Sequence, residues 1–391
     1  MISNNKYDYI ICGGGASGLL LSSALISDNF FDDKKILIIE KEAKVDNDKA
    51  LGFWDSKETI LDEVVFKEWE YAEFKDSEFH NSFLLKPFKY KMIKSSKFYS
   101  HLGEKISDAD NFTYLNANIK NIDQENKIVK TDNGEFQSSI IFSSIYEDKE
   151  IKFNKYPLLK QHFIGWTIET KDQSFDDNKI TFMDFSVDQK NEIRFMYILP
   201  FSKNKALVEY TLFSSSVIDD DEYESEIKNY LKENHIIDYT ILDKEKGLIP
   251  MTCYPFFEKN TDSYFKIGTA GGWSKPSTGY TIKNSLEKID LILNYLKKDK
   301  PLSKISFKNR FWYYDLLFLD VLIESKGNGS KVFSDLFRNN DPIKIFKFLD
   351  EKTSFREELS IFLSVNVMTF IRSLFKRILN FSTHKGSKDM I

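Results

Sequence analysis

A glycine-rich segment near the start of the chain restricts the fold more than any other feature. YDYIICGGGASGLLLSSALI, residues 7–26, predicts a buried strand, a tight turn and a helix. Gly13, Gly15 and Gly18 give the pattern G-x-G-x-x-G in that context. The first glycine makes the turn, the second lets the backbone approach a pyrophosphate, and the third lets the helix pack closely on the strand. With Ala16 at the helix start, they are predicted to bind a dinucleotide. The alternative is a tight turn in an ordinary α/β protein.

The next strand-like run, KKILIIEK, ends in an acid that suits a ribose. Glu40 closes this strand and is placed to accept hydrogen bonds from ribose hydroxyls, with Lys41 directly after it. The spacing from the glycines is longer than the usual ~20 residues, and the polar insert SDNFFDDKK accounts for the difference. A solvated strand end is the alternative for Glu40.

A second glycine-rich loop, GTAGGWSKPSTGY at 268–280, also precedes a predicted helix, which begins near residues 278–281. Bare backbone amides in such a loop suit a flavin ring and its ribityl–phosphate chain. Many flavin hydroxylases carry an Asp after the first glycine, whereas Thr269 stands there in this chain. A plain loop without a ligand is the alternative. The cofactor-binding candidates of the loop are Gly268, Gly271, Gly272, Pro276, Thr278, Gly279 and Tyr280.

Between the two glycine loops the pattern changes to long alternating stretches. HFIGWTIET, KITFMDFSV, NEIRFMYILPF and KALVEYTLFS predict four antiparallel strands between residues 162 and 214. Before them, KIVKTDNGEF predicts a hairpin with its turn at Asn133-Gly134. After them, residues 219–233 predict a surface helix, and the chain is predicted to be helical beyond Pro301.

This order predicts an α/β protein with a Rossmann-type FAD-binding fold of the flavin-hydroxylase kind, an inserted antiparallel-sheet substrate domain and a C-terminal helical region. We place the two parts of the FAD-binding domain at 1–155 and 251–300. The substrate domain is predicted at 156–250 and the helical region at 301–391.

Composition narrows the classes of partner. A net charge of −5 and a pI near 5.8 argue against nucleic acid. Two cysteines cannot form a disulfide framework, which favours a reducing cytosolic setting, and the five histidines show no metal-ligand spacing. No signal-peptide pattern and no run of roughly 18 apolar residues is found, so a soluble or surface-bound protein is expected. Because only one G-x-G-x-x-G pattern is present, a second nucleotide domain for NAD(P)H is not expected, although a transient reductant can still dock.

One carboxylate stands in the middle of an apolar strand. In ALVEYTLFS, residues 206–214, alternation puts Leu207, Glu209, Thr211 and Phe213 on one face. If that face looks into an apolar cavity, Glu209 costs free energy unless it is neutralised or used. A surface-facing or salt-bridged strand residue is the alternative.

Several segments together resemble one enzyme family. QHFIGWTIET, FMDFSV, YILPFSKNKALVEYTLFS and IGTAGGWSKPSTGY, in this order, are similar to segments of bacterial lycopene β-cyclases. YKMIKSSKFYS, WYYDLLFLDVL and LFRNNDPIKIFKFLDE also resemble segments of that family, so the likeness covers almost the whole chain. One segment departs: the family's Arg-Thr-Trp-Cys-Phe-Trp reads KALGFW here, at residues 49–54.

The resemblance implies a cyclisation without net redox change, with reduced FAD as cofactor and NAD(P)H as its electron source. It also implies that Glu209 is the essential acid. The chemistry fits, because a carboxyl in a dry cavity has its pKa raised by desolvation and can protonate C2 of a terminal alkene. The C5=C6 bond attacks the resulting C1 cation, and loss of the C6 proton completes a β-ring, giving γ-carotene and then β-carotene.

Four further residues are candidates around this reaction. Asp184 is predicted to orient the substrate or relay protons, with structural hydrogen bonding as the alternative. Trp166, Tyr197 and Phe201 are predicted walls of a substrate tunnel, with ordinary core packing as the alternative.

An acyclic carotenoid such as lycopene dissolves in bilayers, so a cytoplasmic enzyme on the inner face of the cell membrane is expected. A helix near residues 366–380 carries one apolar face, with Arg372, Lys376 and Arg377 beside it. This pattern is typical of an interfacial helix attracted to anionic lipid. A helix packed on the core with a wet basic face is the alternative.

Two other functions remain open at this stage. One is a redox flavoprotein, a hydroxylase or double-bond reductase, that acts on a prenyl lipid or carotenoid. The other is a non-catalytic carotenoid or flavin binder. Within the cyclase reading, the sequence leaves open one or both ends, β- or ε-rings, NADH or NADPH, and the oligomeric state.

Overall fold

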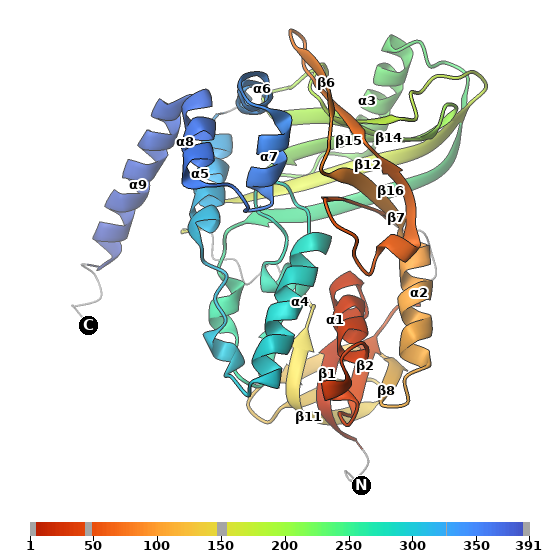
Figure 1. The fold of residues 1–391 in the computed structure, drawn as a ribbon, viewed down its shortest axis with the longest axis vertical. Coiled ribbons are helices and arrows are strands. Elements are labelled where there is room, and N and C mark those ends of the chain that lie inside the picture. The colour runs from red at the N-terminus through yellow and green to blue at the C-terminus, as the bar shows by residue number, and fades with distance from the viewer. Residues whose placement is uncertain (1–4, 44–48, 147–154, 326, 386–391) are drawn as a thin grey trace.

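The computed structural model describes residues 5–43, 49–146, 155–325 and 327–385 (Figure 1). Its lower half is built on a seven-stranded sheet with the order β8-β2-β1-β11-β10-β9, in which β17 pairs with β11 in parallel. The strands are β1 (Lys6–Cys12), β2 (Ile36–Glu40), β8 (Phe112–Asn116), β9 (Ile119–Asp123), β10 (Ile128–Thr131), β11 (Gly134–Ser143) and β17 (Tyr264–Lys266). The predicted hairpin at Asn133-Gly134 is confirmed, because β10 and β11 pair antiparallel up to Thr131 and Gly134.

Helices cover one face of this sheet. They are α1 (Ala16–Ile26), α2 (Ser95–Ser107) and α4 (Ile282–Lys297), and α1 contacts the other two. Figure 1 shows α4, from late in the chain, standing beside α1 from its start. All five residues of β2 are buried, as expected for a parallel sheet covered on its faces.

The upper half is a second seven-stranded sheet with the order β16-β12-β15-β14-β13-β5-β6. The strands are β5 (Tyr71–Lys75), β6 (His80–Leu84), β12 (Leu158–Thr170), β13 (Lys179–Asp184), β14 (Ile193–Ser202), β15 (Lys205–Ser214) and β16 (Tyr239–Thr252). The predicted helix is present as α3 (Asp220–Glu233), and it packs on one face of the sheet. The four predicted strands are confirmed as β12 to β15, and β12, β14 and β15 pair antiparallel.

This sheet is larger than the sequence pattern predicts. β5 and β6 come from the segment that we assigned to the FAD-binding domain, and β5 pairs in parallel with β13. β16 was also not predicted, although it pairs with β12 along its length. A separate three-stranded sheet, β3-β7-β4, consists of β3 (Ala50–Asp55), β4 (Val65–Trp69) and β7 (Lys89–Lys94). The first segment therefore contributes strands beyond the nucleotide-type sheet.

The strand alternation predicted for residues 206–214 is confirmed. Leu207 and Phe213 pack in one hydrophobic cluster with β5, β14 and the C-terminal helices. Val208 and Tyr210 pack in another cluster, against α3. The sheet thus has one face under α3 and one face toward the rest of the molecule, and Glu209 lies on the second.

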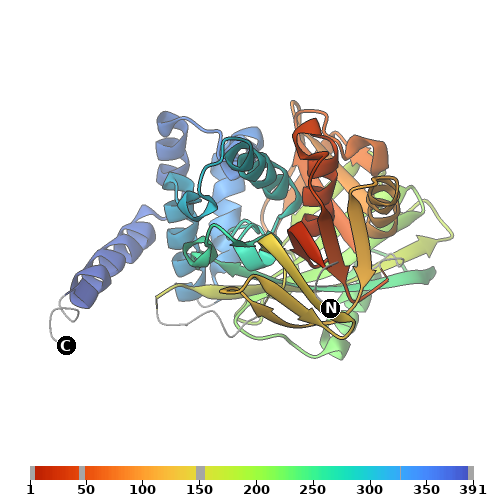
Figure 2. The ribbon, with the colours of Figure 1, turned by 90° about the horizontal axis from the view of Figure 1, so that it is seen from below.

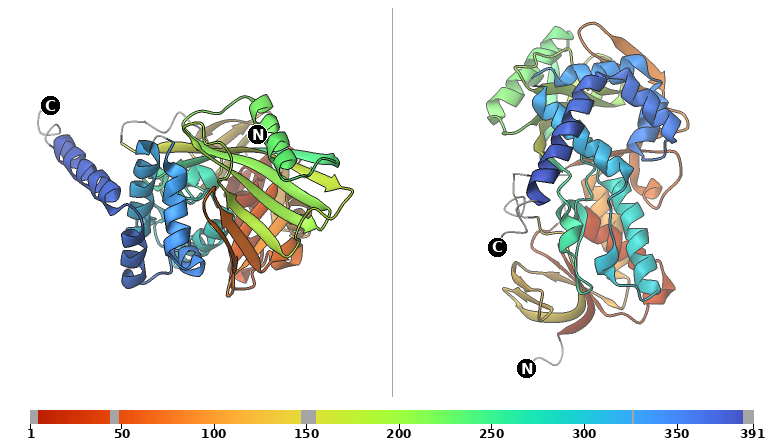
Figure 3. Two further views of the ribbon diagram at one scale, coloured as in Figure 1. Left: turned by 90° about the horizontal axis from the view of Figure 1, so that it is seen from above. Right: turned by 90° about the vertical axis from the view of Figure 1, so that its left-hand side faces the viewer.

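After Pro301 the described chain is helical, as predicted. The helices are α5 (Arg310–Glu324), α6 (Gly329–Asn339), α7 (Pro342–Leu349), α8 (Phe355–Ser364) and α9 (Val367–Lys385). Ser354 and Glu357 form a capping box that fixes the start of α8. In Figures 2 and 3, α9 projects from the body of the molecule.

The described helices were also compared with what a bilayer requires. None of them alone is long and apolar enough to cross a membrane. Only α8 and α9 taken together, residues 355–364 and 367–379, reach that length and composition, and they are bent by 109°.

Candidate active site

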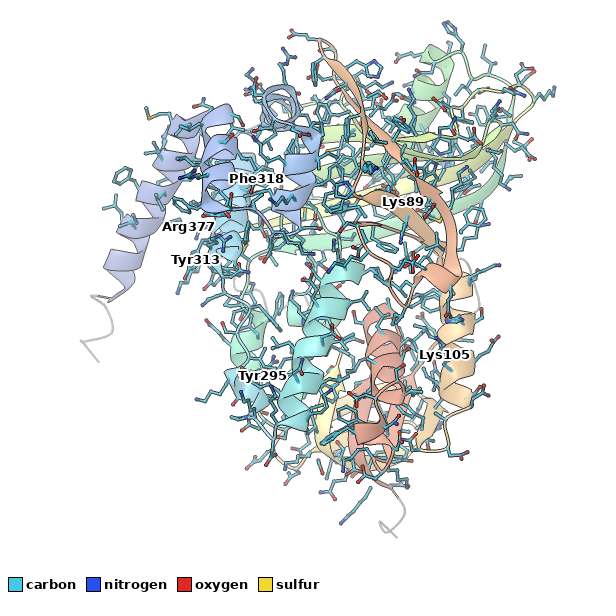
Figure 4. The ribbon with its side chains drawn as sticks, viewed as in Figure 1. Lys89, Lys105, Tyr295, Tyr313, Phe318 and Arg377 are labelled. Carbon is cyan, nitrogen blue, oxygen red and sulfur yellow. The ribbon has the colours of Figure 1, made fainter. Side chains whose placement is uncertain are left out.

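A cavity of about 630 Å³ connects the two glycine loops with the C-terminal helices. This volume lies within the range of small-molecule sites. At one end the wall includes Gly15, Ala16 and Ser17, and in the middle it includes Glu209 and the pocket face of β12 and β14. At the other end the wall consists of side chains from α5 to α9, among them Phe318, which Figure 4 labels on α5. The residues at that helical end include Tyr314, Phe318, Phe348, Phe362, Val365 and Phe370.

The first glycine turn has the geometry that the sequence predicts. Gly13 has φ +103°, a conformation that favours glycine, and a Cβ on Gly18 would overlap the carbonyl oxygen of Gly13. Gly15 is the N-cap of α1, no side chain caps this helix end, and the space beside its Cα is open. The positive end of α1 is therefore free to meet an anionic group at the cavity.

The acid after the second strand stands beside this turn. Glu40 Oε2 accepts a hydrogen bond of 2.7 Å from the amide of Gly14, and Oε1 accepts one of 3.0 Å from the amide of Glu42. The side chain is thereby fixed at the glycine turn, where a ribose would lie. Lys41 is exposed and forms a surface ion pair of 3.3 Å with Glu42.

The second glycine loop meets the first one. A Cβ on Gly268 would lie 2.7 Å from Ser17 Oγ, so glycine at this position lets the two loops touch. Of the seven candidates in this loop, four line the cavity: Gly268, Thr278, Gly279 and Tyr280. The other three do not: Gly271 packs against the backbone of Lys266, and Gly272 and Pro276 line a second, smaller cavity.

A flavin fits these residues. Gly279 has φ +75°, and its missing Cβ leaves room for Gln161, whose buried Oε1 has no hydrogen-bond partner among the described residues. A buried oxygen without a donor is costly, and a flavin ring N–H is a donor of the required kind. Backbone amides, an uncapped helix end and Gln161 together suit a flavin nucleotide.

The predicted acid lies on the wall of the same cavity. Glu209 is 6% exposed, and Thr211 Oγ1 donates a hydrogen bond of 2.5 Å to its Oε1. Burial, and secondly the negative charge of Glu245, raise the pKa of the Glu209 carboxyl well above its ordinary value. Tyr197 is directly opposite Glu209 in the register of β14 and β15. Its surroundings therefore favour the protonated form of the Glu209 carboxyl, and the hydrogen bond from Thr211 holds it in one orientation.

Three tyrosine hydroxyls meet beside Glu209. Tyr90 Oη lies 2.5 Å from Tyr197 Oη and 2.8 Å from Tyr280 Oη, and burial raises the pKa of all three phenols. The cluster depends on Gly52 in β3, because a Cβ there would collide with Tyr90 Oη. It joins the second glycine loop to the acid-bearing sheet. Of the predicted tunnel residues, Tyr197 is the one on the cavity wall.

Asp184 is separated from the cavity. It is opposite Met196 in the pairing of β13 and β14, on the α3 face of the sheet. Its carboxylate accepts 2.6 Å hydrogen bonds from Tyr230 Oη and Ser186 Oγ, and Lys75 Nζ lies 2.9 Å away. The geometry therefore supports the structural alternative rather than a proton relay.

Trp166 and Phe201 are also away from the cavity. Trp166 is opposite Val208, is fully buried in the cluster under α3, and has Lys244 Nζ 5.1 Å from its ring. Phe201 packs edge-on against Phe66 at 5.3 Å between ring centroids. The prediction that these two residues line a tunnel is corrected. Strand register turns Trp166 into the buried cluster under α3, and Phe201 is half-buried at the edge of another cluster.

Sequence reasoning missed several residues of the cavity. Thr211 was placed on the right face but was given no role, and Tyr90 was not singled out. Glu245, which does not line the cavity but raises the pKa of Glu209, was also not singled out. The departing segment at residues 49–54 supplies Lys49, Ala50, Leu51 and Gly52 to the wall. Gly52 in this segment was the available signal for such a role, since a glycine inside a strand often marks a place where another group comes close to the backbone. Among the residues that the structure describes, no group of His, Cys, Asp and Glu side chains is arranged to hold a metal ion.

Comparison with known proteins decides the family. A family model described as lycopene cyclase protein matches residues 8–376. The chain belongs to the lycopene cyclase family. Among curated lycopene cyclases, it is 27% identical to the lycopene beta-cyclase of Paracoccus sp. over 137 residues, which cover 34% of this chain and 35% of the relative. It is 30% identical to the lycopene beta-cyclase of Pantoea ananas over 107 residues, 26% of this chain and 27% of the relative. The matched part thus spans about a third or less of each relative's length.

Solved structures show the fold of this family member. The tryptophan halogenase of Shewanella frigidimarina matches with a TM-score of 0.61 at 12% identity, covering 99% of this chain and 96% of the halogenase. A geranylgeranyl bacteriochlorophyll reductase-like protein of Thermoplasma acidophilum matches with a TM-score of 0.58 at 14% identity, covering 95% and 99%. A halogenase mutant solved in complex with FAD matches with a TM-score of 0.56 at 10% identity, covering 88% and 79%. The predicted Rossmann-type fold of flavin enzymes is confirmed.

Proposed function

We propose that the protein is a lycopene β-cyclase that holds reduced FAD between its two glycine loops. The observation that carries this proposal is Glu209, a buried carboxyl with a raised pKa, on the wall of an aromatic cavity that continues to both loops. Family membership and the likeness to two lycopene beta-cyclases support the choice of substrate. FAD is supported by the fit of Gly15, Gly279 and Gln161.

In the proposed reaction, Glu209 donates its proton to C2 of a terminal alkene of lycopene. The C1 cation that results is attacked by the C5=C6 bond, and the C6 proton returns to the Glu209 carboxylate. Acid and substrate atoms balance, and no electrons are transferred. Thr211 directs the carboxyl, and the surrounding cavity excludes water that would otherwise capture the cation. γ-Carotene and then β-carotene are the products.

Aromatic side chains surround the path of the positive charge. Phe195, Phe213 and Tyr197 line the cavity near Glu209, and Phe182 lies near the tyrosine cluster. Their ring faces stabilise a passing cation. Reduced FAD, when bound, supplies negative charge beside this region, and we propose NAD(P)H as its electron source.

The helical end of the cavity gives lycopene a route from a membrane. Phe362, Val365 and Phe370 bring the cavity wall to the junction of α8 and α9. The outer side of that junction is an exposed apolar surface, here named the α8–α9 surface. Its residues are Phe355, Leu359, Leu363, Met368, Ile371, Leu374, Phe375, Ile378 and Leu379. We propose that this surface rests on the inner face of the cell membrane, with the protein otherwise in the cytoplasm.

Two of the three basic residues named on α9, Lys376 and Arg377, are paired with acids of α5. Arg377 forms two 2.6 Å contacts with Asp320 of α5, and Figure 4 labels it on the side of α9 toward α5. Lys376 forms a 2.6 Å contact with Glu324. Because these two cations are already paired with acids, we propose that insertion of the apolar side chains of the α8–α9 surface supplies most of the membrane affinity.

A redox function is the second candidate. The solved neighbours with this fold include halogenases and a reductase-like protein, whose chemistry is oxidative or reductive. A hydroxylase or reductase of this fold would also place a prenyl lipid beside the flavin.

The test is the mass of the product. Purified protein is incubated without oxygen with reduced FAD and with liposomes that contain lycopene. The pigments are then separated by chromatography, and their molecular masses are measured by mass spectrometry. The proposal expects products isomeric with lycopene that co-elute with γ- and β-carotene, without stoichiometric NAD(P)H consumption. Added hydrogen or, when oxygen is admitted, added oxygen would support the redox candidate instead, and a spectral shift without a product would indicate a binder.

A further inference from the structure

Two glutamates lie on either side of one glycine in neighbouring strands. Gly165 in β12 is opposite Glu209 of β15 on one side and opposite Glu245 of β16 on the other. Residues directly opposite one another in neighbouring strands point to the same face of a sheet. A Cβ on Gly165 would lie 3.5 Å from Glu209 Cβ and 3.1 Å from Glu245 Cγ. Because Gly165 has no side chain, no group of β12 stands between the side chains of Glu209 and Glu245 at this position.

The two acids have different surroundings. Glu209 is deeply buried, and no ion pair joins it to a Lys or Arg in the part of the chain that the structure describes. Glu245 is partly exposed, and its Oε2 accepts a 2.9 Å hydrogen bond from the amide of Ala50. A backbone N–H donor favours the ionised form of a carboxyl, whereas burial favours the neutral form.

No other titratable group near Glu209 in the described structure supplies a charge in place of Glu245. Tyr197 from β14, Tyr90 from β7 and Tyr280 from the second glycine loop are neutral near pH 7, because burial raises their pKa values. Lys49, in the segment before β3, is the cationic side chain on the described cavity wall. It supplies no ion pair to Glu209 in the described structure.

We propose that Glu209 and Glu245 share one proton across Gly165, and that Glu245 is the ionised positioning residue that keeps this proton on Glu209 between turnovers. The negative charge of Glu245 disfavours a second negative charge on the buried Glu209 carboxyl. The proton therefore resides on the more buried acid, and Ala50 holds the charge on the other. The catalytic consequence rests on the proposed cyclase function, but the shared proton itself does not.

The sign of the pH effect follows from this arrangement. Glu209 is active when protonated, so cyclisation is lost as pH rises through its pKa. Removing the negative charge of Glu245 lowers the pKa of Glu209, and the alkaline limit of activity moves to lower pH. Glu245→Gln preserves the shape and an oxygen for the Ala50 amide while it removes the negative charge.

The experiment measures the pH profile of kcat in lycopene-loaded liposomes for the wild type, Glu245→Gln and Glu245→Ala. In both variants, the pH at which kcat falls on the alkaline side is expected to lie about one unit or more below that of the wild type. At acidic pH both variants are expected to approach the wild-type kcat. Glu169→Gln, an exposed acid at the end of β12, is the matched control and keeps the wild-type profile. A shift in Glu245→Ala alone would indicate a structural role of the Ala50 contact and would overturn the proposal.

A second measurement does not depend on turnover. Difference infrared spectroscopy follows the C=O band of the protonated Glu209 carboxyl, identified by its loss in Glu209→Gln. This band is expected to titrate at lower pH in Glu245→Gln than in the wild type. An unchanged titration would overturn the shared proton. A shifted titration without any cyclised product would instead leave the carboxyl pair in place and refute the cyclase function.

Discussion

At the scale of single residues, a substitution of Asp184 can distinguish a structural role of this acid from a catalytic one. It is 0% exposed, and its carboxylate is held by Tyr230, Ser186 and Lys75. Asp184→Asn keeps the size of the side chain but leaves the Lys75 cation with a neutral partner. We expect a loss of about 2–4 kcal/mol in the free energy of unfolding, measured by urea denaturation, with cyclisation per folded molecule unchanged.

The control is a second acid in the same region of the chain. Asp188 is exposed and accepts one hydrogen bond, from the amide of Lys190. Asp188→Asn is expected to change the free energy of unfolding by no more than about 0.5 kcal/mol. If Asp184→Asn kept full stability but lost turnover, Asp184 would belong to the reaction after all.

The residues that sequence predicted well are those whose placement is local. Alternation along one strand correctly grouped Glu209 with Leu207, Thr211 and Phe213 on one face, and the family resemblance implied its role. Trp166 was misplaced because its face depends on the register between β12 and β15, which no short segment encodes. Glu245 was missed for the same reason, since only the pairing of β16 with β12 brings it to Gly165.

At the scale of elements, the α8–α9 surface is the feature that connects the fold to a membrane. Met368, Phe375 and Leu379 are 71%, 61% and 65% exposed. Replacing all three by serine removes apolar contact worth roughly 1.5–3 kcal/mol per fully inserted side chain. We expect sedimentation with liposomes to fall at least about tenfold, while the free energy of unfolding changes little because these side chains have few contacts to lose.

A matched control uses an exposed apolar residue elsewhere. Ile237, after α3, is 74% exposed. Ile237→Ser is expected to leave liposome binding as in the wild type. If the triple variant and the wild type bound liposomes equally, α9 would be an ordinary surface helix with no part in membrane binding.

Elements with a strong local pattern were predicted, and those stabilised by distant partners were not. α3 was predicted from a run rich in Asp, Glu and Lys, and the chain after Pro301 was predicted to be helical as a whole, without the boundaries of its helices. β5 and β6 are five residues each, and the pair joins the larger sheet through β5 and β13, which lies far along the chain. Short strands of this kind carry too little pattern to be recognised without their pairing.

At the scale of the whole molecule, the site is assembled from distant parts of the chain. The glycine loops at 13–18 and 268–280 meet at Ser17 and Gly268, and Figure 1 shows α1 and α4 side by side. The order of domains made this meeting predictable, because each loop follows a strand of one sheet. The cavity beyond them was not predictable, because segments from β3 to α9 line it.

The most direct measurement compares wild type and Glu209→Gln with reduced FAD and lycopene in liposomes without oxygen. Glutamine preserves the Thr211 hydrogen bond but cannot give a proton to an alkene, so flavin binding and the free energy of unfolding are expected to be retained. We expect β-ring products of unchanged mass from the wild type and none from the variant. Ring formation by Glu209→Gln at the wild-type rate would contradict it.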